Sequence, residues 1–243
     1  RIIAVDALSR GERVFLLSVE ARDGAVRARV LTLTPGAKRW APQGRPINLG
    51  GSAVPRLSWA DGSLHLTATR PRRPRLIVAR LSSAGTWQRY VPPAGRVDGR
   101  RWPLGPLLAG VVSARSQLAL GFSMTRGKWR FGVLLPRSGR FYAAPRPRGN
   151  QQGLVVPSSR GQLLAVWREE FGPRNALRMR RYYALLGADP KGWRDRLAAA
   201  RPFAETPWLF SDVVALKDRR GRDVLLHAVE RDGRIRYARI DVR

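Results

Sequence analysis

The sequence predicts an all-β fold, a five-bladed β-propeller built from four-stranded antiparallel blades. Three observations lead to this prediction. Hydrophobic residues make up 44% of the 243 residues, as in globular domains, and Gly and Pro are frequent, as many turns require. A small turn flanked by apolar segments recurs along the whole chain. These turns end at residues 11, 62, 116, 161 and 221, a spacing typical of propeller blades.

We therefore expect a single domain over residues 1–243. Its blades are predicted at about residues 1–45, 46–100, 101–148, 149–205 and 206–243. Each recurring turn joins the first strand of a blade to the second. The turns are Ser9–Gly11, Ala60–Gly62, Ala114–Ser116, Ser159–Gly161 and Arg219–Gly221.

An apolar segment precedes each turn, as expected for an innermost strand that is buried on both faces. These segments are Ile2–Val5, Ala53–Leu57, Leu108–Val112, Leu154–Val156 and Val213–Leu216. The second strands follow at Val14–Val19, Leu64–Thr69, Leu118–Ser123, Leu163–Trp167 and Val224–Val229. Third strands of alternating polarity come after a charged hairpin, at Val26–Leu33, Leu76–Leu81, Trp129–Leu135, Leu177–Leu185 and Ile235–Val242.

The first and last blades have nearly the same sequence at the hairpin between their second and third strands. The segment Val19–Gly24 matches Val229–Gly233, and both end in Asp-Gly. This pair favours a tight hairpin, because Gly adopts the positive φ angle that such a turn needs. The match supports one repeated unit.

A Gly-bearing turn and an aromatic residue follow the third strand in four blades and predict the outer, fourth strand. The pairs are Gly36 with Trp40, Gly85 with Trp87, Gly139 with Phe141 and Gly192 with Trp193. In the fourth blade Asp189 and Pro190 also fit the start of a short helix. Trp193, Leu197 and Ala200 would then share one helix face, an irregular strand being the alternative. The last blade is three-stranded, or its outer strand lies upstream of the first residue.

The segment Ser82–Trp87 lies between the predicted third and fourth strands of the second blade. Its sequence, Ser-Ser-Ala-Gly-Thr-Trp, resembles a degenerate Asp-box without the Asp, the turn found here in sialidases and related glycosidase-like propellers. The resemblance covers the architecture of the whole chain. For an enzyme it implies an arginine triad, a Tyr nucleophile with a Glu partner and an Asp acid. Sialidases have six blades, whereas five are predicted here.

The composition is strongly basic, with 46 Lys and Arg against 17 Asp and Glu and a formal net charge of +29. A GC-rich bacterial genome explains the preference for Arg over Lys but not the shortage of acids. A positive field of this strength favours anionic partners. We expect an anionic glycan, a lipid headgroup, a nucleic acid or an acidic protein subunit, the last as part of a larger assembly.

Ligands of propellers usually bind around the central channel, at the end that carries the second-to-third hairpins and the blade links. Arginine forks there would hold anionic groups, and aromatic rings would stack on sugars or bases. The predicted ligand-binding residues are Arg70, Arg72, Arg73, Arg75, Arg100, Arg101, Trp102, Arg126, Trp129, Arg146, Arg148 and Trp208. The opposite end offers an alternative face for an acidic partner, with Arg10, Arg115, Arg160 and Arg220. Ordinary solvated arginines are the competing explanation at both ends.

A glycosidase needs two carboxyl groups beside the bond that it cleaves. The acids predicted at the ligand end are Glu20, Asp98, Glu169, Glu170, Glu205, Asp212 and Glu230. For an enzyme we select Asp212 at the channel, approached by Glu170 and Glu205. Tyr183 is the selected nucleophile, with Tyr182 as its alternative.

Other catalytic chemistry has little support. The chain has no Cys, which excludes disulfides, zinc–thiolate sites and Cys nucleophiles. His65 and His227 fall in second strands, where packing is the expected role. No phosphate-binding loop or dinucleotide fingerprint is present. We expect no cofactor and no metal.

The sequence thus favours a non-catalytic binding or scaffold propeller whose basic face engages an anionic polymer or an acidic partner subunit. The alternative is a glycosidase or sialidase-like hydrolase with a carboxylate pair at the channel mouth. No apolar segment is long enough to span a bilayer. The chain begins with Arg1 and not Met, which favours a removed leader and an extracytoplasmic location, periplasmic or secreted; a cytoplasmic location is the alternative.

Overall fold

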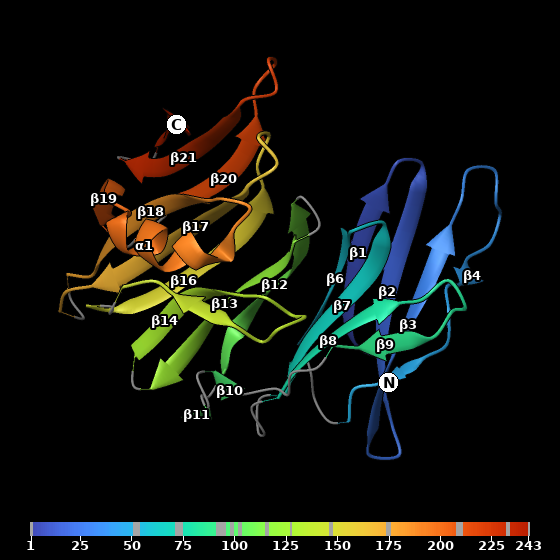
Figure 1. The fold of residues 1–243 in the computed structure, drawn as a ribbon. Helices are drawn as coiled ribbons and strands as arrows, with labels where there is room; N and C mark the ends of the chain where they lie inside the picture. Colours follow the sequence, from blue (N-terminus) through green and yellow to red (C-terminus); the bar gives the residue numbers. More distant parts are fainter. Residues whose placement is uncertain are drawn as a thin grey trace.

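The computed structural model describes residues 2–50, 54–70, 75–90, 96–97, 100–101, 104–114, 117–126, 128–145, 148–173, 176–207, 211–231 and 234–242. Five antiparallel sheets follow one another along the chain (Figure 1). In the first four, four strands pair in sequence order, with a short fifth strand added to the first sheet, and the last sheet has three strands. The predicted all-β propeller of four-stranded blades with a three-stranded last blade is therefore confirmed.

The first sheet comprises β1 (Ile2–Arg10), β2 (Arg13–Arg22), β3 (Ala25–Leu33) and β4 (Ala41–Pro42), and β5 (Ile47–Asn48) also pairs with β3. The second comprises β6 (Val54–Ala60), β7 (Ser63–Arg70), β8 (Arg75–Leu81) and β9 (Trp87–Arg89). A ribbon of β10 (Arg96–Val97) and β11 (Arg100–Arg101) precedes the third sheet, which comprises β12 (Leu104–Ala114), β13 (Gln117–Arg126), β14 (Lys128–Leu134) and β15 (Phe141–Ala143).

The fourth sheet comprises β16 (Asn150–Pro157), β17 (Leu163–Phe171), β18 (Arg178–Leu186) and β19 (Pro202–Pro207). The last comprises β20 (Ser211–Lys217), β21 (Asp223–Arg231) and β22 (Arg234–Asp241). The segment Ile47–Asn48, which the sequence assigns to the second blade, pairs with β3 of the first sheet instead.

Turn chemistry sets the strand boundaries as the sequence predicts. Asp23 and Gly24 join β2 to β3 with φ angles of 50° and 72°. Asp61 and Gly62 join β6 to β7 with φ angles of 49° and 67°. Two consecutive positive φ angles make the tight hairpin whose twist matches that of the flanking strands.

The fourth sheet contains the predicted helix. Asp189 accepts a hydrogen bond from the Lys191 N–H, a short 3₁₀ turn follows, and α1 (Trp193–Ala199) continues from it. Trp193 and Leu197 are fully buried against the third and fourth sheets. The helix is thus confirmed, and Trp193 does not mark the fourth strand, because β19 begins only after the helix.

The core consists of apolar layers between successive sheets. Separate clusters join the first sheet to the second, the second to the third, the third to the fourth and the fourth to the last. The innermost strands of the first and last sheets, β1 and β20, each expose one face. Val5 on β1 is 58% exposed and Val214 on β20 is 50% exposed. The expected burial of both faces is wrong for these two strands, because each end sheet packs against one neighbour among the described residues. No described helix is long and apolar enough to cross a membrane.

Candidate functional site

The structure describes part of the predicted ligand end. Trp129 and Arg148 are described with their side chains. For another group the strand backbone is described and the side chains are not: Arg70, Arg75, Arg100, Arg101 and Arg126. The rest lie outside the described residues: Arg72, Arg73, Trp102, Arg146 and Trp208. The two predicted ligand-binding residues with described side chains, Trp129 and Arg148, therefore lie at the third and fourth sheets.

Trp129 and Arg148 both lie at the junction of β14 and β16. The Trp129 N–H donates a hydrogen bond to Asn150 Oδ1 at 3.1 Å. The Arg148 N–H donates one to Glu169 Oε1. Arg148 is exposed and Trp129 is half-buried. The fold brings these two predicted ligand residues to one junction between sheets.

Glu169 is a buried carboxylate at the same junction, with 4% exposure. Its Oε2 accepts a hydrogen bond from the Tyr182 hydroxyl at 3.0 Å. The Tyr182 ring stacks on Trp167, with ring centroids 5.3 Å apart. Burial, together with the charge of Glu169, raises the pKa of Tyr182. The phenol therefore stays protonated at neutral pH and stabilises the buried carboxylate.

The selected acids Glu170 and Glu205 point to opposite faces of the fourth sheet. Arg180 on β18 pairs in register with Glu169 on β17 and with Glu205 on β19. These three side chains therefore lie on one face of the sheet. Glu170 is paired with Met179 and so points the other way. Glu170 and Glu205 therefore do not share a face of the fourth sheet, because successive side chains of a strand alternate between its faces. Their predicted approach to Asp212 stays a prediction, since the Asp212 side chain lies outside the described part.

Both acids are held by arginines. Glu205 Oε1 lies 2.7 Å from Arg178 Nη2, and its Oε2 lies 2.7 Å from Arg180 Nε. Glu170 pairs with Arg168 at 3.2 Å. The hydrogen bond from Arg180 lowers the pKa of Glu205, so this carboxyl is ionised at neutral pH. It cannot serve as the general acid, which must carry a proton.

Tyr183 lies on the sheet face opposite to that of Tyr182. It packs toward the last sheet, with its ring centroid 5.8 Å from that of Phe203. The selected nucleophile is thus part of the core between the fourth and last sheets. Asp212 lies in β20, paired with Ala228, and its side chain is outside the described part.

The two histidines pack in the core, as predicted. His65 is fully buried, stacks on Tyr90 and donates from Nε2 to the Ala60 carbonyl at 3.0 Å. Burial lowers its pKa to about 4. His227 is buried against the edge of Phe203. Among the described residues no group of three or more His, Asp or Glu side chains is placed to hold a metal ion.

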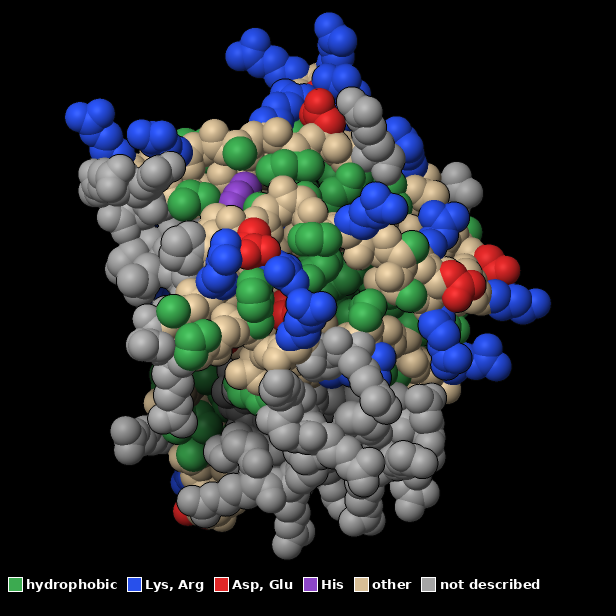
Figure 2. Space-filling view, turned by 90° about the vertical axis from the view of Figure 1, so that its left-hand side faces the viewer, with side chains coloured by type: hydrophobic (Ala, Val, Ile, Leu, Met, Phe, Trp, Pro, Cys, Tyr) green, Lys and Arg blue, Asp and Glu red, His purple; other side chains and the backbone are tan. Residues whose placement is uncertain are grey.

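The opposite, turn-bearing end is described more fully. Arg10, Arg160 and Arg220 are exposed at their turns, whereas Arg115 lies outside the described residues. Figure 2 shows basic side chains projecting from the upper edge of the molecule, the edge at which the β20–β21 turn lies in Figure 1. This end therefore presents positive charge to solvent.

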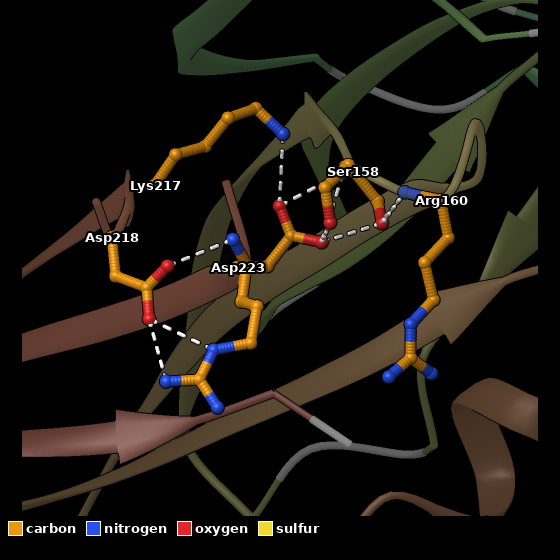
Figure 3. Close-up of polar contacts among 7 residues, drawn as sticks. Ser158, Arg160, Lys217, Asp218 and Asp223 are labelled. Carbon is orange, nitrogen blue, oxygen red and sulfur yellow. Dashed lines mark hydrogen bonds and ion pairs between the residues drawn. The ribbon is translucent and has the colours of Figure 1, made fainter. Parts of the chain in front are cut away.

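Asp223 joins the turn of the fourth sheet to the last sheet (Figure 3). Its carboxylate accepts hydrogen bonds from the hydroxyls of Ser158 and Ser159, both at 2.7 Å, and from the Ser159 N–H at 2.9 Å. Lys217 Nζ lies 3.1 Å away. Burial alone would raise the pKa of Asp223, but these donors hold it at about 2. The turn that carries Arg160 is thereby fixed to the last sheet.

Beside this junction is an open pocket of about 570 Å³ at the β20–β21 turn. Its lining consists of Lys217, Asp218, Arg219, Arg220, Arg222 and Arg239. Sequence reasoning identified Arg220 as part of a repeated turn position. It missed the pocket, because Arg239 reaches it from the far end of β22 only after the hairpins have formed.

No protein-family model matches the sequence, and no curated protein matches it. Solved structures of similar fold include the α-L-arabinofuranosidase of Fusarium graminearum, a β-propeller glycosidase. Its complex with arabinobiose has a TM-score of 0.55 at 12% identity, and its complex with an iminosugar inhibitor has 0.52 at 13%; each match covers 99% of this chain and 81% of that chain. A prolyl endopeptidase matches 94% of this chain and 31% of its own, with a TM-score of 0.50 at 14% identity. At these identities the likeness shows a shared fold.

Proposed function

We propose that the chain is a binding propeller for an acidic glycan. The main support for this proposal is that the protein's own acidic side chains are mostly paired already and leave many arginines unbalanced. Most of those described are engaged inside the protein, by arginines, hydroxyls or backbone N–H groups: Asp6, Asp61, Asp189, Asp218, Asp223, Asp241, Glu169, Glu170 and Glu205.

The arginines are left in excess at the surface. Arg27 and Arg29 are exposed on β3, and Arg234 and Arg236 are exposed on β22, with no ion pair to any described residue. Unpaired guanidinium forks bind sulfate and carboxylate groups in two-point contacts. The shared fold with an arabinofuranosidase solved with arabinobiose favours a glycan among the anionic polymers.

Sulfated and uronic glycans are expected to bind with a strong dependence on salt. Each arginine contact releases a counterion, so affinity should fall at least about tenfold between 50 and 200 mM NaCl. Calorimetric titration with heparin and polygalacturonate measures this, and neutral arabinan serves as the control. Absence of binding to both acidic glycans at low salt would overturn the proposal. Tighter binding of duplex DNA than of either glycan at equal salt would assign a nucleic acid instead.

A second candidate function, glycoside hydrolysis, is favoured by one arrangement in the fourth sheet. Glu169 and Glu205 lie on the same face, on either side of Arg180, and Tyr182 contacts Glu169. Two strand spacings separate the two acids, about 10 Å between Cα atoms. In glycosidases it is the carboxyl groups that lie about 5 to 10 Å apart, a range that two Glu side chains on one sheet face can reach from this Cα separation. Glu205 would be the ionised member of the pair.

This second function predicts turnover of aryl α-L-arabinofuranosides that depends on Glu205. Glu205→Gln should lower kcat by about 100-fold or more, because an ionised base or nucleophile is lost. Glu12→Gln, at an exposed position outside the arrangement, is the matched control and should leave kcat unchanged. Equal rates in the wild type and in Glu205→Gln would exclude this site as the catalytic centre.

A further inference from the structure

The pocket at the β20–β21 turn combines five basic residues with a single acid, Asp218. The basic groups come from three places: Lys217 ends β20, Arg239 lies on β22, and the turn itself carries the other three. Positive charge therefore surrounds the pocket from several directions. Asp223 and Asp241 also pair with Lys217 and Arg239, so three carboxylates oppose five basic groups; the remaining positive charge attracts an anion from solvent.

Asp218 holds the pocket in shape. Its Oδ1 accepts hydrogen bonds from the N–H groups of Arg220 and Arg222, both at 2.9 Å. Its Oδ2 lies 2.8 Å from Arg222 Nη2 and 2.9 Å from Arg239 Nη2. These donors, with the backbone N–H of Arg222 first, keep the pKa of Asp218 well below its ordinary value. Asp218 thus stays ionised and fixes the turn and two guanidinium groups at once.

Two of the fixed guanidinium groups retain unused donors. Arg222 uses Nε and Nη2 on Asp218, and Arg239 uses Nε on Asp241 and Nη2 on Asp218. The Nη1 group of each has no hydrogen-bond partner among the described residues, and a guanidinium carries five N–H donors, so both Nη1 groups can donate to an anion. Guanidinium groups already held in place lose little side-chain entropy on binding an anion.

Arg219 and Arg220 complete the pocket from the turn. Both side chains are exposed, and neither forms an ion pair with a described residue. Lys217 is engaged by Asp223, whose bonds to Ser158 and Ser159 anchor this side of the pocket to the fourth sheet (Figure 3). Donors therefore line the pocket from more than one element, and a tetrahedral oxyanion offers acceptor oxygens in more directions than a planar carboxylate.

We propose that this pocket is a specific site for a tetrahedral oxyanion, the sulfate or phosphate ester group of a larger ligand. The site goes beyond the diffuse binding of an acidic glycan, because it stands whether or not the ligand is a glycan. Arg219 and Arg220 supply the mobile contacts, and Arg222 and Arg239 supply the fixed ones. A sulfated sugar and a phosphate monoester share this chemistry.

Inorganic sulfate and inorganic phosphate are the probes, titrated by calorimetry at constant ionic strength with chloride as the balancing anion. The wild type should bind one ion saturably. Arg219→Ser/Arg220→Ser should weaken this binding about tenfold or more, since two charged hydrogen-bond donors are lost. Arg13→Ser/Arg39→Ser removes the same charge from exposed positions of the first blade that do not line the pocket. This control should change the affinity by about twofold at most.

Equal weakening in the two double variants, or no saturable binding in the wild type, would overturn the proposal. A test without substitution uses phenylglyoxal, which modifies exposed arginines. Sulfate should protect Arg219 and Arg220 but not the exposed Arg13 in peptides analysed by mass spectrometry, and equal modification of Arg219 and Arg220 with and without sulfate contradicts the site. Competition by a sulfated disaccharide and by a phosphate monoester then identifies the source of the group.

The result for the pocket is separable from that for the glycan. Saturable sulfate binding without heparin binding retains the pocket and rejects the glycan proposal. Salt-dependent heparin binding without saturable sulfate binding retains the glycan proposal and rejects the pocket.

Discussion

Replacing Trp193 with Ala is expected to destabilise the protein by about 4 kcal/mol, as for large aromatic residues in cores. The Trp193 side chain is fully buried, and its Nε1–H donates to the Gly187 carbonyl at 2.8 Å. Its ring packs edge-on against Tyr142 of the third sheet, with centroids 5.3 Å apart. The substitution therefore opens a cavity between two sheets and leaves a carbonyl without its donor. Urea denaturation measures the change.

The matched control is the next residue of the same helix. Arg194 is exposed, so Arg194→Ala should change the free energy of unfolding by about 0.5 kcal/mol at most. A loss below about 1 kcal/mol in Trp193→Ala would show that the helix does not close the core as described.

Acidification is expected to remove about 3 kcal/mol of stability through His65 alone. Burial, aided by the charges of Arg80 and Arg137, lowers the pKa of His65 from 6.5 to about 4. The folded protein thus takes up this proton less readily than the unfolded chain. The stabilisation is fully present above about pH 6.5 and is lost as the pH falls toward about 4.

The free energy of unfolding, measured at a series of pH values, tests this expectation. His65→Gln should lose about 2 kcal/mol less than the wild type between pH 7 and pH 5, because the titrating group is gone. His227→Gln separates the contribution of the second buried histidine, whose pKa burial also lowers. Parallel pH curves for the wild type and His65→Gln would contradict the assigned role of His65.

Local patterns predicted most of the fold. Alternating polarity and recurring turns located the strands, because both depend on residues close in sequence. The Asp23-Gly24 hairpin and the Asp189 N-cap followed from backbone preferences of single residues. The exposed faces of β1 and β20 could not be predicted from local patterns, because burial depends on which sheet lies beside a strand.

The candidate sites were only partly predictable, since they depend on register and on contacts between sheets. A shift of one residue decides that Glu169 and not Glu170 shares a face with Glu205. The sequence shows both acids but not which side each faces. The same limit applies to Tyr182 and Tyr183, of which only Tyr182 contacts a carboxylate among the described residues.

The sequence by itself determined the propeller and its excess of arginines, because repeated turns and composition are properties of the chain. Only the tertiary structure decided where that charge is concentrated. Arg239 joins Asp218 and Arg222 across 17 or more residues of chain, because β20, β21 and β22 fold back on one another. Asp223 is likewise withdrawn from the surface by Ser158 and Ser159 of another sheet. Charge balance at a surface is set by such long-range partners, which no local pattern specifies.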